Sequence, residues 1–197
     1  LVNVIFQVLA FAVSLIIMFV LYKPVANMIM ENTSLDENLS AAIAGNLSGT
    51  TLADGNLIDV NQTNISASVV NLINSFVTEA LNKTEANVIG YVSGQLAIMM
   101  IYTGTMLGLF IVSRLLLTIV RFVAELIGNL PIIKLFNKSG GLVFGIFKGF
   151  VIVYAILAIL SVLSPIISQL GIISSIQDSI LGSSMYNNNV LLKLFFK

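Results

Sequence analysis

The sequence predicts an all-α, multi-pass transmembrane protein with an amphipathic-helical segment outside the membrane. Of its 197 residues, 57% are hydrophobic and only 9% are charged, whereas about 25% of the residues in an ordinary soluble domain carry a charge. The mean hydropathy is +1.02. A soluble chain of this size has too little polar surface to cover so many apolar side chains. Three long apolar stretches between polar segments therefore favour three membrane-spanning helices.

The first apolar stretch, residues 1–22, contains no charged residue. As a helix that rises about 1.5 Å per residue, it reaches about 33 Å, which is enough to cross a hydrocarbon core of about 30 Å. Lys23 and Pro24 follow, and they predict the membrane interface and the end of the span. Asn3 and Gln7 are four residues apart, so we expect them to share a face that contacts a neighbouring helix.

Residues 23–90 form a segment that is rich in Asn, Ser and Thr, and its charged residues after Lys23 are seven acids and Lys83. Such a segment is long for a connecting loop, and its composition predicts that it lies in water. Two helices are expected within it, near 34–44 and over 66–82. The first is indicated by Ser34 and Glu37, which have the spacing of a capping box.

The helix at 66–82 carries a regular apolar stripe. Its members include Val69, Ile73, Phe76 and Ala80. The polar half of this helix has Glu79 and no basic residue before Lys83, unlike helices that lie on anionic membranes. We therefore expect the stripe to pack against protein, either the helix near 34–44 or the outer end of a span, as a cap over the membrane helices. A sharper hypothesis makes this cap the docking site of an extracytoplasmic partner.

The second and third spans are predicted over 91–120 and 140–164, and both contain glycines four residues apart. Small residues at this spacing let two helix backbones approach closely in lipid. The expected helix-packing positions are Gly104, Gly108, Gly141, Gly145 and Gly149. The close contacts are expected within the chain or between copies of it.

Basic residues set the predicted orientation. Segment 114–148 contains one acid, Glu125, and five basic residues, which are Arg114, Arg121, Lys134, Lys138 and Lys148. The positive-inside rule then places the loop at 121–139 in the cytoplasm, and segments 23–90 and 165–197 outside. In the tail, isoleucines at 172, 173, 176 and 180 predict one amphipathic helix over 166–181, which lies on the membrane surface or on the rest of the protein.

Arg114, Arg121 and Lys148 are the basic residues expected within or next to the spans. They can anchor two helices, bind anionic lipid head groups or line a wet vestibule, and anchoring is the interpretation we adopt. A Ser-Lys dyad with Lys148 is disfavoured, because a lysine near a helix end usually snorkels to the interface. A proton-coupled carrier is also poorly supported, because Glu125 follows Arg121 by four residues, the spacing of an ordinary ion pair.

The residue types also exclude whole classes of function. The chain contains no cysteine and no histidine, so disulfides, thiolate nucleophiles, His-dependent catalysis and nearly every zinc site are excluded. We expect no enzyme, no cofactor and no metal site. A formal net charge of zero argues against a nucleic-acid partner. The expected partners are the lipid bilayer, further copies of the chain, and an envelope or export protein.

Residues 129–157 resemble the colicin V production protein family of bacterial multi-pass inner-membrane proteins. The resemblance rests on Pro131, the Asn137-Lys138 pair, the three-glycine face from Gly141 to Gly149, and Lys148 before the last of these glycines. The tail at 183–192, SSMYNNNVLL, and residues 1–31 with their Tyr-Lys-Pro exit at 22–24 are also similar to that family. Residues 32–85 match no motif of it.

The family usually has one more helix and a short turn before the helix at 1–22. Because the chain begins at Leu1 inside an apolar stretch, we expect a fragment of a four-span protein. The resemblance implies a non-catalytic scaffold or accessory role in toxin production or export and in envelope homeostasis. The alternative is a small oligomeric channel or transport subunit. Tyr102, Thr103, Thr105 and Ser113 form no continuous polar stripe, which weighs against conduction.

Overall fold

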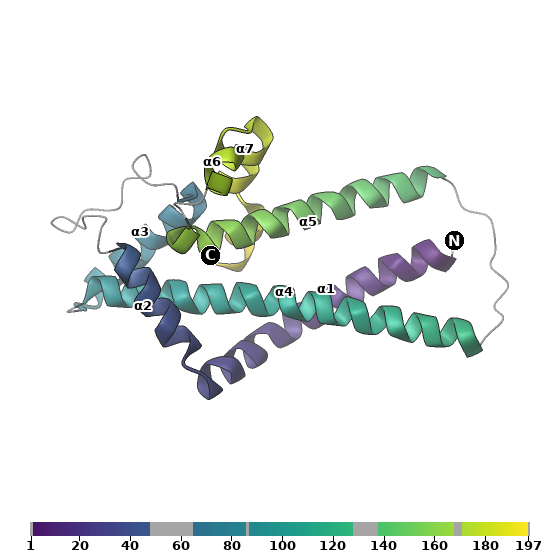
Figure 1. The fold of residues 1–197 in the computed structure, drawn as a ribbon, viewed down its shortest axis with the longest axis horizontal. Helices are drawn as coiled ribbons and strands as arrows, with labels where there is room; N and C mark the ends of the chain where they lie inside the picture. Colours follow the sequence, from purple (N-terminus) through teal and green to yellow (C-terminus); the bar gives the residue numbers. More distant parts are fainter. Residues whose placement is uncertain (1, 48–64, 86, 128–137, 168–170, 197) are drawn as a thin grey trace.

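The computed structural model describes residues 2–47, 65–85, 87–127, 138–167 and 171–196, and every regular element in these ranges is an α-helix. Three helices are long and apolar enough to cross a membrane. They are α1 (Val2–Asn32), α4 (Val88–Ile127) and α5 (Lys138–Ile167). The prediction of an all-α, multi-pass membrane protein is confirmed, and Figure 1 shows α1 crossing α4 while α5 separates from α4 toward its own N-terminal end.

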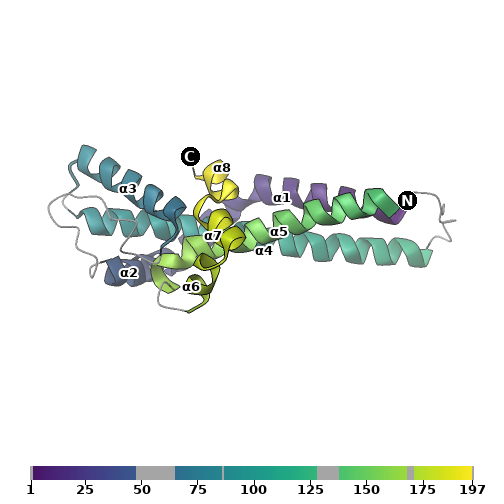
Figure 2. The same ribbon diagram turned by 90° about the horizontal axis from the view of Figure 1, so that it is seen from above.

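Five shorter helices gather at one end of the long ones. They are α2 (Leu35–Leu47), α3 (Ala67–Asn82), α6 (Gly171–Gln177), α7 (Ile180–Asn187) and α8 (Val190–Phe195). In Figures 1 and 2, α2 and α3 flank the first turns of α4, and α6 to α8 lie beside the C-terminal half of α5. Helices α2 and α3 thus occupy the positions where the sequence predicts helices near 34–44 and over 66–82.

The first long helix does not end at Pro24, as the sequence predicts, but continues to Asn32. A proline removes one backbone N–H and strains the preceding turn, yet a transmembrane helix tolerates this cost when the freed groups find other partners. The end of α1 is stabilised by its own side chains. Asn32 Nδ2 donates to Met28 O, and Thr33 Oγ1 donates to Ile29 O, both over 2.7 Å.

Pro165 likewise lies inside α5, whose end was expected near Ser164. Pro165 has no N–H to donate to Ser161 O, the carbonyl four residues earlier. The hydroxyl of Ser164 donates to that carbonyl over 2.6 Å. A serine therefore replaces the missing donor, and the helix continues to Ile167.

The tail contains two short helices where one was expected over 166–181. The chain turns at Asp178 and Ser179, and Ser179 Oγ accepts a hydrogen bond from Gly182 N, which caps the start of α7. The turn also separates the predicted apolar face, because Ile173 is fully buried whereas Ile180 is 90% exposed. A polar cap in the middle of an apolar pattern therefore ended the helix earlier than periodicity suggested.

The helix α4 is longer than the predicted span at 91–120. It contains 40 residues, which corresponds to about 60 Å, or twice the thickness of the hydrocarbon core. Residues 121–127 were expected in a basic loop but belong to α4, because they contain neither glycine nor proline. The rest of that loop up to residue 137 lies outside the described residues. A helix of this length that crosses a bilayer along its normal therefore extends well beyond the hydrocarbon core.

An aromatic pair indicates where α4 leaves the membrane. The rings of Tyr22 and Tyr102 meet edge to face at 5.7 Å, and Tyr102 Oη donates to Asn27 Oδ1 over 3.4 Å. Lys23 lies above the Tyr22 ring at 5.9 Å. Tyrosine and lysine concentrate at membrane interfaces. Residues 88–101 of α4 lie on the α2 and α3 side of this pair, and we interpret them as outside the hydrocarbon layer.

Candidate functional site

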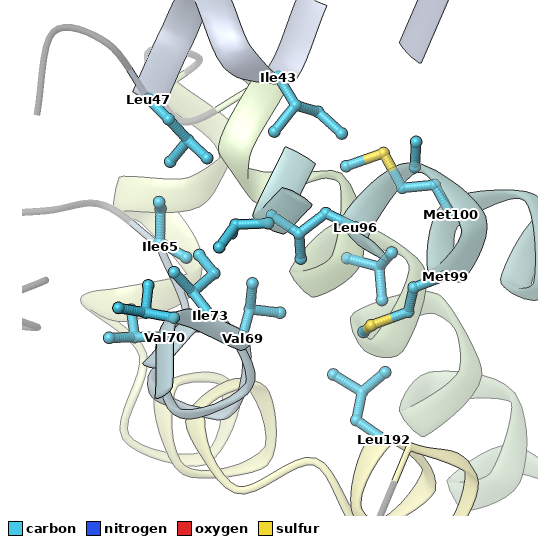
Figure 3. Close-up of a cluster of buried hydrophobic side chains, with 14 of the residues drawn as sticks. Ile43, Leu47, Ile65, Val69, Val70, Ile73, Leu96, Met99, Met100 and Leu192 are labelled. Atoms are coloured by element: carbon cyan, nitrogen blue, oxygen red, sulfur yellow. The ribbon is translucent and has the colours of Figure 1, made fainter. Parts of the chain in front are cut away.

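The buried side chains concentrate where α4 projects beyond this boundary. Here α2, α3, the first turns of α4, the last turns of α5 and the short α8 enclose one apolar cluster, which we call the cap core. Figure 3 shows its central members. The labelled side chains are Ile43, Leu47, Ile65, Val69, Val70, Ile73, Leu96, Met99, Met100 and Leu192. Five elements that are distant in sequence thus share one core.

The predicted stripe of α3 faces this core. Val69, Ile73 and Ala80 are fully buried, and Phe76 is partly buried against the cluster. The helix begins at Ser66, whose Oγ accepts a hydrogen bond from Val69 N. Both α2 and α3 pack on α4, so the stripe meets the projecting end of a long helix. The expectation that it packs against protein agrees with this burial.

The Asn-rich tail fastens α3 and α5 to each other. Asn187 Oδ1 accepts from Ala67 N over 3.1 Å, and Asn187 O accepts from Ser68 Oγ over 2.6 Å. Asn189 is fully buried, and its Nδ2 donates to Tyr154 O over 3.0 Å. Asn189 Oδ1 also accepts from Leu191 N and Leu192 N, and so caps α8. We call Asn187 and Asn189 the tail clip.

Tyr186 directly precedes Asn187, the first asparagine of the tail clip, in the sequence. It is fully buried against Leu157 and Ile173, and Tyr186 O accepts from Ser161 Oγ over 3.3 Å. Burial raises the pKa of its phenol above 10, an effect that Ser164 partly counters, so the ring stays neutral. This tail was noted in the sequence for its resemblance to a family, but none of these contacts was predicted. The available signal was a run of asparagines in an otherwise apolar tail.

Two of the basic residues join α4 to the start of α1. Arg114 Nη1 donates to Gln7 O over 3.4 Å, and the Arg121 guanidinium lies 5.7 Å from the centroid of the Phe6 ring. Such contacts favour helix anchoring among the roles that the sequence leaves open. Lys148 is half-buried on α5, and the described part of the chain gives it no hydrogen bond or ion pair. The side chain of Glu125 lies outside the described residues.

The glycine positions are open rather than closely packed within the chain. A Cβ atom added at Gly104, Gly108, Gly145 or Gly149 would meet no neighbouring atom within 4 Å. Close helix contact within the chain is therefore wrong for these four positions, because open space surrounds each of them. Contact between copies stays a prediction, and nothing around Gly141 is described.

An exposed ionic contact links the end of α3 to the start of α4. Lys83 Nζ donates to Glu79 Oε1 over 2.7 Å and to Tyr91 Oη over 3.0 Å. The hydrogen bond from Lys83 is the main cause that lowers the pKa of Glu79 from its usual value of 4.5. Because the contact of Lys83 with Glu79 and Tyr91 is exposed to solvent, it orients the two helices but adds little to the stability of the fold.

The described residues contain no group of acidic side chains that could hold a metal ion. Several hydroxyl groups within the spans bond to carbonyls of their own helix, as Ser14 does with Ala10 O over 2.7 Å and Thr103 with Met99 O over 2.8 Å. They are thus committed to the backbone rather than to a bound molecule. Comparison of the chain with protein-family models, curated proteins and solved structures finds no match.

Proposed function

We propose that the chain is a non-catalytic membrane scaffold, which holds a folded helical cap at one face of the membrane for an envelope or export protein to bind. The observation that carries the proposal is the position of the cap core. The best-packed region lies where α4 projects beyond the spans, and it draws on α2, α3, α5 and α8. A rigid surface outside the membrane suits a stable partner more than it suits transport.

The resemblance to the colicin V production proteins extends the proposal to a setting. It implies a bacterial inner membrane as the setting, with a role in toxin production or export and in envelope homeostasis. By the positive-inside rule, the cap would face away from the cytoplasm. The tail clip supports this role, because its hydrogen bonds join α3 of the cap to α5. The surface that a partner would bind is thereby held in a fixed position relative to the spans.

An oligomeric channel is the alternative. Ser14 is fully buried and Thr103 partly buried, and both hydroxyls are bonded to their own helix, so the described spans offer no obvious hydrophilic path within one chain. A pore would then require several copies. Conductance of the purified chain in planar bilayers, lost in a Lys148→Leu variant, would support the channel and argue against the scaffold.

The decisive experiment is photocrosslinking in native membranes. A photoreactive residue at Leu81, which is 52% exposed on the cap, is compared with one at Leu115, which is 60% exposed on the span half of α4. We expect a discrete protein adduct from Leu81, identified by mass spectrometry, and adducts of lipid or of the chain itself from Leu115. Absence of any protein adduct from Leu81 and from the neighbouring exposed positions Asn71 and Thr78 would contradict the proposal.

A further inference from the structure

An apolar groove of about 480 Å³ runs between α1, α4, α5 and α8. Its walls include Met18, Phe110, Ala155 and Phe195, one from each helix. Thr103 is the one polar residue among those that line it, and its hydroxyl is already bonded to Met99 O. Such a wall offers water no partner, so the groove does not suit water. Its volume lies within the range of about 300–1,000 Å³ found for ligand sites.

Most of the groove lies at membrane depth, and its end at Ala158 and Leu192 adjoins the cap core. The residues that line it on the long helices all belong to the stretches that can cross a bilayer, and on α1 they end at Phe19, before the interface marked by Tyr22 and Tyr102. Its surroundings are therefore hydrocarbon. The helices α1 and α5 both pack on α4 but hardly on each other, which leaves the groove between them.

The mouth of the groove carries positive charge. Phe19 of α1 and Phe195 of α8 stack with their ring centroids 5.2 Å apart. Lys23 follows Phe19 by four residues and so lies one helical turn further toward the interface. The side chain of Lys23 is exposed. Lipid phosphates lie at this depth and are attracted to such lysines.

We propose that the groove binds one acyl chain of an anionic phospholipid, with the phosphate near Lys23. In lipid no hydrophobic effect favours one apolar chain over another. Selective binding then comes from close packing in the groove, where dispersion contacts add up, and from the lysine at its mouth. The bound lipid would act as the missing contact between α1 and α5.

The first test measures lipid that stays bound. The full chain is reconstituted in vesicles of equal phosphatidylcholine and phosphatidylglycerol, extracted, washed in excess detergent and weighed by native mass spectrometry. We expect one retained phosphatidylglycerol per chain. Ala155→Trp fills the groove and should lower this retention by about tenfold, a difference of about 1.4 kcal/mol. The matched control Val143→Trp, at a position 67% exposed on the same helix, should leave it unchanged.

The second test does not require the groove to be filled. The chain has no tryptophan, so Phe110→Trp reports from the groove, whereas Phe122→Trp, at a position 62% exposed on α4, reports from the lipid-facing surface. In phosphatidylcholine vesicles with a small fraction of brominated phosphatidylglycerol, the groove reporter should be quenched more strongly.

Four results would overturn the proposal. They are equal quenching of the two reporters, equal retention in Ala155→Trp and Val143→Trp, a retained free fatty acid in place of a phospholipid, and a lipid-free dimer. The last would assign the groove to a second copy of the chain.

Discussion

The two halves of α4 have similar apolar composition and opposite surroundings. In the half within the cap, Val92, Leu96 and Ala97 are almost fully buried, whereas in the span half Leu116, Ile119 and Val120 are 57–60% exposed. The difference lies in what covers each half. Beyond the Tyr22–Tyr102 pair, α2 and α3 cover the helix, which is the arrangement that burial of apolar surface from water favours. Within the bilayer, lipid is as apolar as the side chains, so nothing forces α5 against α4.

This comparison also explains where the polar contacts concentrate. The cap half of the molecule holds the tail clip, the Lys83–Glu79 contact and the capped starts of α3, α7 and α8. The span half has the contacts of Arg114 and Arg121 with α1. Stability should therefore respond strongly to changes in the cap and weakly to changes on the open faces of the spans.

The largest expected effect concerns which end of the molecule, the cap or the loop at 121–139, lies outside the cytoplasm, because cysteine labelling is all-or-none. The chain has no native cysteine, so single cysteines report without background. An impermeant maleimide should label Asn82→Cys in intact cells and Asn137→Cys only after lysis, since basic residues favour the cytoplasm. The reverse pattern would place the cap in the cytoplasm and exclude an extracytoplasmic partner.

Removing a core side chain from the cap should produce the largest loss of stability. Ile73→Ala creates a cavity at a fully buried position, and we expect it to lower the free energy of unfolding by about 2–5 kcal/mol. Ile119→Ala, at a position 58% exposed on the span half, should change it by less than about 0.5 kcal/mol. Denaturant unfolding in detergent measures both. Equal losses would show that the span half is packed against protein after all.

Breaking the tail clip should cost less than a core cavity. Asn189→Ala removes the α8 cap and the bond to Tyr154 O, so we expect a loss of about 1–3 kcal/mol and faster proteolysis of the tail. The adjacent Asn188→Ala serves as control, because Asn188 is exposed and its side chain makes one long contact, 3.5 Å, with Lys193 Nζ. If both variants lose the same stability, Asn189 does not fasten the tail.

Two glycines should respond in opposite directions to alanine. A Cβ at Gly182 would lie 3.0 Å from Ile176 O and 3.2 Å from Ser179 Cβ, so Gly182→Ala should destabilise the tail by about 1 kcal/mol. A Cβ at Gly145 meets nothing within 4 Å, and Gly145→Ala should leave the monomer unchanged or stabilise it by up to about 1 kcal/mol. The unfolding midpoint in detergent checks both signs.

A leucine at Gly145 separates the monomer from a contact between copies. Gly145→Leu should leave the unfolding of the isolated chain unchanged, and it should reduce oligomer size in size-exclusion chromatography if the glycine face joins copies. A destabilised monomer would show that α5 packs closely within the chain.

The smallest effect is expected at the exposed Lys83–Glu79 pair. The pKa of Glu79 is lowered in the folded state, so its stabilising contribution is present above pH 4.5 and is lost as the pH falls through the lowered pKa. Wild type should therefore unfold at a slightly higher midpoint than Glu79→Gln at pH 7, and the two midpoints should converge in strong acid. High salt should also reduce the difference. If the difference between the two unfolding midpoints persists in acid, packing causes it and the charge of Glu79 does not.

The sequence by itself determined the properties that depend on local pattern. Apolar length fixes the three spans, because each must satisfy its own backbone within the bilayer. The 3.6-residue period of Val69, Ile73 and Ala80 identified the buried face of α3, and the anchoring role adopted for Arg114 agrees with its contact to Gln7 O. These inferences needed no knowledge of which helix lies next to which.

Only the tertiary structure decided the properties that depend on distant partners. The contacts of Asn187 with Ala67 and Ser68 join residues 119 and 120 positions apart, and no local pattern predicts such a pair. The glycines looked like packing positions, but open space surrounds four of them. Pro165 looked like a helix end until the hydroxyl of Ser164 reached Ser161 O. In each case the outcome depends on which atoms the fold brings within hydrogen-bonding or van der Waals distance.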